Sequence, residues 1–132
     1  MSNWTHVAAI FRVDHFGFLY EQEPLDFDEI FGKECLYHSS SDLWDEAEKH
    51  PEEFLPMGSE GSLHKSVWEN PDHSCIAAYT VSVFGDLRDH DSLDDIIEWF
   101  NKTCEKVWIR QAVVTVDNEW YGSKTARYEE DS

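Results

Sequence analysis

The sequence predicts a single α+β domain of the ferredoxin-like, split β-α-β kind, in which a four-stranded antiparallel sheet carries two helices on one face. Three observations favour this class. The chain has 132 residues, a length typical of one domain, and 41% of them are hydrophobic. Apolar residues alternate as in strands in some segments and recur at helical spacing in others. These segments follow one another in the order strand, helix, strand, strand, helix, strand.

The first strand is predicted over residues 4–14. Val7, Ala9 and Phe11 fall on one face of this segment, and Ile10 makes the centre of the other face apolar as well. A strand that is apolar on both faces is typical of the inside of a sheet. We therefore expect this strand to lie between two others.

The first helix is predicted over residues 42–50, because the serines at positions 39–41 offer N-cap hydroxyl groups. A shorter helical turn precedes it at residues 26–31 and ends at Gly32. The irregular stretch between the first strand and this helix is longer than most connections, so it fits the predicted fold least well.

Two further strands are predicted over residues 63–68 and 75–84. Residues 70–72 (Asn-Pro-Asp) supply turn chemistry between them, and a connection this short favours an antiparallel hairpin. The second of these strands is predicted to end at Phe84, directly before Gly85.

The helix predicted over residues 93–107 is the clearest element of the sequence. Ser92 and Asp95 form a capping box at its start. The last strand is predicted over residues 108–117, where residues of the two faces alternate. The helix carries apolar residues at helical spacing, namely Leu93, Ile96, Ile97, Phe100, Cys104 and Val107.

The domain is predicted to occupy residues 1–121, and residues 122–132 are expected to form a polar acidic tail. A sheet with helices on one side leaves its other face open, and residues such as Ile10 and Ile76 are expected there. Because exposed apolar faces are usually covered, we expect either dimerisation or the segment 16–37 to cover this one.

The charge balance argues against binding to nucleic acids and to anionic membranes. The chain has 28 acidic and 10 basic residues and a formal net charge of −18. Binding DNA or RNA needs clustered lysines and arginines, and a surface this negative also repels anionic membranes. Its natural complement is a basic protein surface or a cation. The sequence matches neither a transmembrane helix nor a signal peptide, so the expected location is the cytoplasm.

The metal-ligating residue types form weak patterns. Residues 86–91 offer Asp86, Asp89, His90 and Asp91 to a hard cation, but without the residue order of an EF-hand loop. Two further pairs, Cys35 with His38 and His73 with Cys75, are each half of a zinc ligand set. We predict no metal and no cofactor. The cysteines are expected to be reduced and buried, and they are Cys35, Cys75 and Cys104.

Patterns that carry catalysis are weak as well. The sequence has neither a Gly-x-Ser-x-Gly nucleophile elbow nor a phosphate-binding Gly-x-x-x-x-Gly-Lys-Ser/Thr loop. Acidic pairs for acid–base catalysis are so abundant that no one pair is informative. The sequence therefore predicts a protein that is not an enzyme.

The acidic residues gather on the two predicted helices. Carboxylates three or four positions apart on a helix stand about 5–6 Å apart, close to the spacing of phosphates along a nucleic-acid strand. Two such helices side by side would present a phosphate-like array to a protein that grips DNA, while the alternative is a solvated face that keeps the protein soluble. The predicted partner-binding residues are Asp42, Asp45, Glu46, Asp91, Asp94, Asp95, Glu98 and Trp99.

Three blocks of the sequence carry a resemblance. They are residues 3–7 (Asn-Trp-Thr-His-Val), 58–68 (Gly-Ser-Glu-Gly-Ser-Leu-His-Lys-Ser-Val-Trp) and 83–89 (Val-Phe-Gly-Asp-Leu-Arg-Asp). The chain resembles small acidic proteins of tailed phages and prophages along most of its length. This resemblance implies a setting among phage accessory genes, some of which encode inhibitors of host defence, including acidic proteins that imitate DNA. It transfers no catalytic motif and no site residue.

The expected function is therefore that of a non-catalytic phage or prophage accessory protein. It would inhibit a host nuclease or DNA-binding defence protein by occupying that protein's basic surface, in the host cytoplasm and without contacting nucleic acid or membrane itself. One alternative is the sequestration of a small nucleotide at a homodimer interface, for which Arg12, Arg88 and Arg110 are the candidates. Another is a structural or assembly role in which acidity serves solubility alone.

Overall fold

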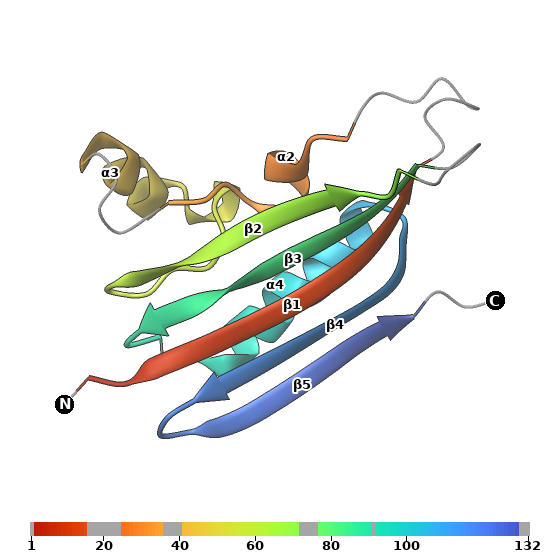
Figure 1. Ribbon diagram of the computed structural model, residues 1–132. Coiled ribbons are helices and arrows are strands. Elements are labelled where there is room, and N and C mark those ends of the chain that lie inside the picture. The colour runs from red at the N-terminus through yellow and green to blue at the C-terminus, as the bar shows by residue number, and fades with distance from the viewer. Residues whose placement is uncertain (1, 16–24, 36–40, 72–76, 91, 130–132) are drawn as a thin grey trace.

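The computed structural model describes residues 2–15, 25–35, 41–71, 77–90 and 92–129, with only the backbone of Ser41 and Asp42. These residues form a five-stranded antiparallel sheet in the order β2-β3-β1-β4-β5, with three α-helices and one 3₁₀ helix (Figure 1). The strands are β1 (Trp4–His15), β2 (Gly61–Glu69), β3 (Ala77–Arg88), β4 (Ile109–Asn118) and β5 (Gly122–Glu129). The helices are α2 (Phe27–Phe31), α3 (Ser41–Lys49), η1 (Pro51–Glu53) and α4 (Leu93–Lys106).

The α+β character is as predicted, but the four-stranded ferredoxin-like sheet with two helices is wrong. The described residues have one more strand and one more α-helix than that arrangement. The additional strand comes from residues 122–129, a segment too polar to reveal a strand and expected to be a tail. The additional helix, α2, is the short helical turn that the sequence predicts at residues 26–31, which the predicted fold did not count among its two helices.

The central strand β1 confirms the alternation in the sequence. Val7, Ala9, Phe11 and Val13 are buried on the face that α4 covers. β3 pairs with β1 on one side and β4 pairs with it on the other, over nearly its whole length. The apolar second face therefore belongs to a strand inside the sheet, as predicted.

The hairpin predicted between the second and third strands is present, since β2 pairs antiparallel with β3. Gly85 does not end β3, which continues to Arg88. A Cβ atom on Gly85 would lie 2.2 Å from the carbonyl oxygen of Ser62, and one on Gly61 would lie 2.1 Å from that of Asp86. The two glycines thus allow the β2 and β3 backbones to approach each other.

The fifth strand replaces the predicted tail. Asn118 is buried at the end of β4, and its side-chain oxygen accepts hydrogen bonds from the backbone N–H groups of Trp120 (2.8 Å) and Tyr121 (2.9 Å). This Asx-type turn is followed by Gly122, whose φ of 88° is one that glycine adopts readily. The chain reverses there and β5 pairs with β4 over the full length of β5.

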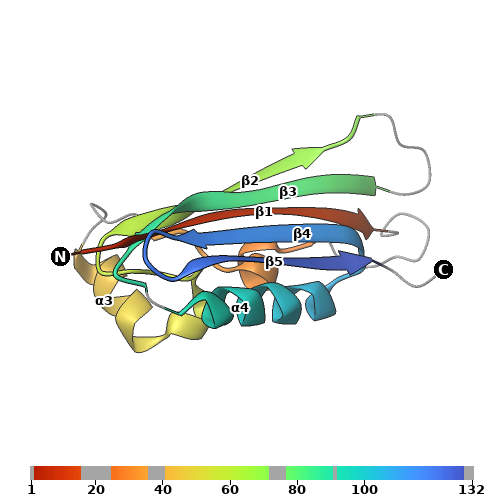
Figure 2. The ribbon, with the colours of Figure 1, turned by 90° about the horizontal axis from the view of Figure 1, so that it is seen from below.

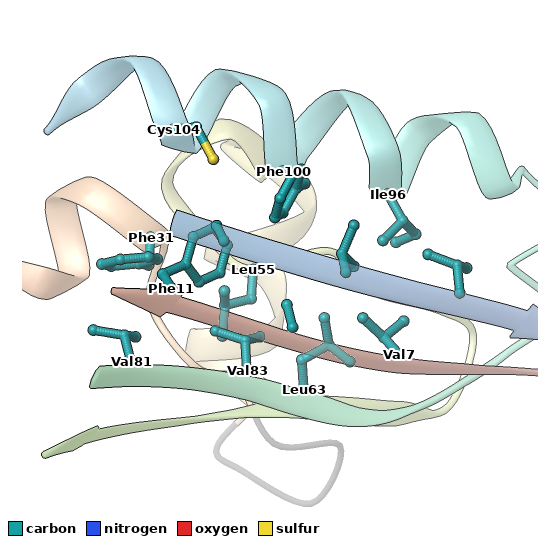
Figure 3. Close-up of a cluster of buried hydrophobic side chains, with 14 of the residues drawn as sticks. Val7, Phe11, Phe31, Leu55, Leu63, Val81, Val83, Ile96, Phe100 and Cys104 are labelled. Atoms are coloured by element: carbon teal, nitrogen blue, oxygen red, sulfur yellow. The ribbon is translucent and has the colours of Figure 1, made fainter. Parts of the chain in front are cut away.

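Helix α4 follows its sequence signals closely. The Ser92 hydroxyl caps it by accepting a hydrogen bond from the backbone N–H of Asp95 at 3.2 Å. Ile96, Phe100 and Cys104 point from the helix toward the strands, where the main core lies (Figure 3). The amphipathic spacing therefore predicts both the helix and the face that it buries.

The sequence predicts that one helix besides α4 packs on the sheet, whereas in the structure α2 contacts the main core and α3 packs on a separate cluster. α2 begins at the Asp26 cap, ends at Gly32 and inserts Phe31 into the main core, where its ring meets Phe11 edge-on at 4.9 Å. α3 forms over nearly the predicted range, but it rests on a small separate cluster of three buried residues, Cys35, Ala47 and Phe54. Helix α3 has too few apolar residues to cover a sheet.

All of the helices lie on the same side of the sheet (Figure 2). The described part of the irregular segment, residues 25–35, packs on that side too, through Phe31 in the main core and Cys35 in the small cluster. No described residue of this segment therefore covers the opposite face, and Ile76 lies outside the described residues. No helix in the described ranges is long and apolar enough to span a membrane.

Candidate functional site

A groove runs between α4 on one side and α3 with η1 on the other, with a volume of about 560 Å³. This volume falls within the range of small-ligand and anchor pockets, about 300–1,000 Å³. The segment that follows η1 supplies much of its apolar lining. The apolar residues that line the groove are Trp44, Ala47, Pro51, Phe54, Leu55, Pro56, Met57 and Trp99.

Two tryptophans stand in the opposite walls of the groove. Trp99 of α4 donates a hydrogen bond from its indole N–H to the backbone carbonyl of Phe31 at 3.0 Å and packs edge-on against Phe11 at 5.8 Å. Trp44 of α3 donates from its indole N–H to Glu48 at 3.0 Å. Because both indole groups have partners, the walls present aromatic surface in a defined orientation.

The rim of the groove is acidic. Four carboxylates, those of Glu48, Glu52, Asp95 and Glu98, line it together with two lysines. Lys102 forms an ion pair with Glu98 at 2.8 Å, and this hydrogen bond, with the attraction of the same carboxylate, raises the pKa of Lys102 above its ordinary value. The acidic groups therefore exceed the basic groups by two, and one of the basic groups is already engaged.

His90 contributes a hydrogen-bonding group to the lining. Its Nδ1 lies 2.9 Å from the backbone carbonyl of Met57, so this nitrogen carries a proton and donates. Its Nε2 is buried and has no hydrogen-bond partner among the described residues.

The structure divides the predicted partner-binding residues. Asp95, Glu98 and Trp99 line the groove. Asp45 and Glu46 line a separate shallow hollow with Lys49 and His50.

Asp94 forms an ion pair with Lys124 of β5, which partly neutralises its charge. The Asp42 side chain and the whole of Asp91 lie outside the described part of the structure. The single array expected from two helices is therefore distributed over several surfaces.

Sequence reasoning missed half of the groove. Glu48 and Glu52 complete the acidic rim, and Trp44 forms the second aromatic wall. The spacing of Trp44 and Glu48 by four residues places them on one face of α3, and this was an available signal. A second available signal is the apolar run at residues 54–57, which lies close to an acidic helix in the sequence.

The candidate cation loop is occupied by contacts within the chain. Asp86 belongs to β3 and pairs with His6 at 2.5 Å. Asp89 accepts hydrogen bonds from the Asn3 backbone (3.1 Å) and the Ser59 hydroxyl (3.2 Å). No group of three or more metal-ligating side chains occurs among the described residues.

The zinc half-sites are described only in part. Cys35 is buried in the small cluster beneath α3, while His38, His73 and Cys75 lie outside the described residues. Cys104 is buried in the main core, and burial raises the pKa of its thiol to about 12. A thiol with this pKa is protonated at neutral pH, which lowers its reactivity.

The arginines considered for nucleotide binding do not converge within one chain. Arg88 pairs with Glu60 at 2.9 Å, near the Trp4 end of β1. Arg12 lies toward the other end of β1, and Arg110 is paired there with Asp14 at 3.4 Å. The geometry of one chain thus gives the nucleotide alternative no support.

Comparisons with known proteins add no identity. A scan of protein-family models, a search of curated proteins and a search of solved structures each found no match. The groove therefore has to be interpreted from its own residues.

Proposed function

We propose that this protein is a non-catalytic inhibitor that binds a basic surface of a nucleic-acid-gripping protein in the groove between α3 and α4. The observation that carries the proposal is that an acidic rim and an apolar lining occur together in one groove. The setting that goes with it, a phage-encoded protein acting on a host defence protein in the host cytoplasm, comes from the resemblance of the three sequence blocks.

The acidic rim and the apolar lining of the groove contribute differently to binding in this proposal. Glu48, Glu52 and Asp95 attract lysines and arginines of the partner, which raises the association rate and makes binding sensitive to salt. Trp44 and Trp99 receive an apolar side chain, whose burial slows dissociation. A partner segment that carries both basic and apolar residues fits better than a purely basic one.

An amphipathic basic helix is the simplest segment of this kind, because such helices bind apolar grooves through anchors on one face. A segment that normally contacts DNA phosphates carries the same basic groups. Its capture in the groove would keep it from nucleic acid.

Capture from a bacterial lysate at low and at raised salt, with the chain immobilised, tests this function. The groove variant Glu48→Gln/Glu52→Gln removes two rim charges, and the matched variant Asp45→Asn/Glu46→Gln removes two charges from the separate hollow. We expect a basic partner that is lost at raised salt and lost from the groove variant only.

The captured protein is then purified and its DNA binding is measured with and without the chain. Release of DNA by the wild-type chain, but not by the groove variant, supports inhibition. Unchanged DNA binding in the presence of a saturating amount of the chain would overturn the inhibitor function, even if the groove binds the partner.

A further inference from the structure

The outer face of the sheet, opposite the helices, forms a separate surface. The strand registers align four rows of side chains across all five strands, which makes 20 outward residues. Ile10, Phe84 and Trp68 in these rows are 52%, 48% and 57% exposed. Exposed apolar side chains grouped on one face are typical of an interaction surface.

This outer face differs from the rest of the chain in charge. Its acidic residues are Asp86, Asp117 and Glu129, and its basic residues are Arg12 and Arg127, which gives a net charge of −1. The chain as a whole carries −18, so almost all of its net charge lies elsewhere. Seven of the 20 residues are serines or threonines, which are uncharged and small.

We propose that the outer face binds the outer face of a second copy of this chain. Two chains with a charge of −18 repel each other, and they approach most easily where carboxylates are few. The helices all lie on the other side of the sheet (Figure 2). Face-to-face packing of two outer faces therefore places the two helical layers on opposite sides of the dimer. The α3–α4 grooves of both copies then stay open to solvent.

The area of the outer face is close to the area that each chain buries in a stable dimer. Five strands spaced about 4.8 Å apart and four rows about 6.8 Å apart cover roughly 650 Å² of flat sheet. Side-chain relief adds to this area, and a stable protein interface buries about 800 Å² on each partner. Ile10, Ala8 and Phe84 lie near the middle of the rows, where an interface core needs apolar groups.

The dimer and the groove respond to salt in opposite directions. Salt screens the repulsion between two negative chains, so it strengthens the dimer, whereas it weakens the attraction between the groove and a basic partner. The two proposals therefore fail independently of each other.

Sedimentation velocity over a range of concentrations, at low and at raised salt, tests the dimer. We expect a species of twice the chain mass of 15.5 kDa that increases with concentration and with salt. Ile10→Thr/Phe84→Thr should weaken the dimer at least about tenfold, because it removes the central apolar groups. Trp120→Ser is the matched control, since Trp120 is 52% exposed but lies in the β4–β5 turn, and it should leave the mass unchanged.

Circular dichroism checks that the double variant is folded. Thr115→Asp provides a second variant, because Thr115 is exposed on the same face and the change removes no apolar contact. A wild-type chain that stays monomeric under all conditions would overturn the proposal. So would a dimer that neither Ile10→Thr/Phe84→Thr nor Thr115→Asp weakens.

Discussion

Individual residues show where sequence reasoning succeeds. The cap at Ser92 and the buried Cys104 follow from local pattern alone, because capping and amphipathic spacing depend on residues a few positions apart. Lys65 shows the opposite. Its side chain is 8% exposed, and its ammonium group donates to the carbonyl of Gly32 at 2.7 Å and pairs with Asp28. Nothing near Lys65 in the sequence indicates that it joins β2 to α2.

The three sequence blocks at residues 3–7, 58–68 and 83–89 contribute mainly to the sheet. Gly61 lies in one block and Gly85 in another, and both permit the close approach of β2 and β3. Asp89, at the end of the same block as Gly85, connects the end of β3 to Asn3 and Ser59. These blocks cover nearly all of β2, the start of β1 and the end of β3, and they supply no residue to the groove except Gly58.

His6 provides a prediction for pH dependence. Its hydrogen bond to Asp86 raises its pKa above the ordinary 6.5, with smaller contributions from Glu119 and Asp117. Because the folded-state pKa is the higher one, this pair stabilises the fold fully below pH 6.5, and the stabilisation is lost as pH rises through the raised pKa. NMR titration should place His6 above 6.5, and Asp86→Asn should lower its pKa.

Asp117→Asn is the matched control, because Asp117 flanks His6 on the β4 side and acts on it only through charge. It should lower the pKa of His6 by less than Asp86→Asn does. A His6 pKa at or below 6.5 in the wild type, or equal effects of the two variants, would contradict this account.

At the scale of elements, long periodic segments are predictable and polar edges are not. α4 and β1 are predictable because each carries a repeated apolar pattern. β5 was missed because an edge strand is rich in charged and polar residues, and every residue of β5 except Ala126 is exposed. Asn118 and Gly122, at the two ends of the turn, were the available signal.

The position of α3 could not be predicted either. Its range follows from the serines before it, but its packing depends on Cys35 and Phe54, which come from separate segments. Such contacts between distant segments leave no periodic trace in a sequence. The sequence therefore does not reveal the α3 side of the groove. It does predict binding residues on the α4 side, namely Asp95, Glu98 and Trp99.

Deleting β5 tests the corrected fold. A chain that ends at Tyr121 loses every β4–β5 pair and uncovers β4, where Val114 and Val116 are fully buried. We expect its free energy of unfolding to fall by roughly 3 kcal/mol or more. Urea denaturation followed by tryptophan fluorescence measures this loss.

The control for this deletion is a chain that ends at Glu129, which keeps the whole of β5. It should unfold like the full-length protein. Equal stability of the chain ending at Tyr121 and the full-length protein would show that residues 122–129 act as a tail after all.

At the scale of the whole molecule, the two sides of the sheet have different characters. The helical side holds the groove and its acidic rim, while the outer face carries a net charge of only −1. A formal charge of −18 spread evenly would favour solubility alone, whereas this separation favours two distinct surfaces. In our proposals, the helical side binds a basic partner and the outer face binds a second copy.

The central claim is that the groove, and not diffuse negative charge, binds basic segments. Calorimetric titration with an amphipathic helical peptide of lysine and leucine, at fixed salt, tests it most directly. A peptide of equal charge without leucine serves as the control ligand. The amphipathic peptide should bind more tightly than the control peptide.

The same titration with the two matched variants decides between the groove and diffuse charge. Glu48→Gln/Glu52→Gln should weaken binding of the amphipathic peptide about tenfold, or about 1.4 kcal/mol, and Asp45→Asn/Glu46→Gln should change it by less than about twofold. Equal weakening by both variants, or equal affinity for both peptides, would contradict the account.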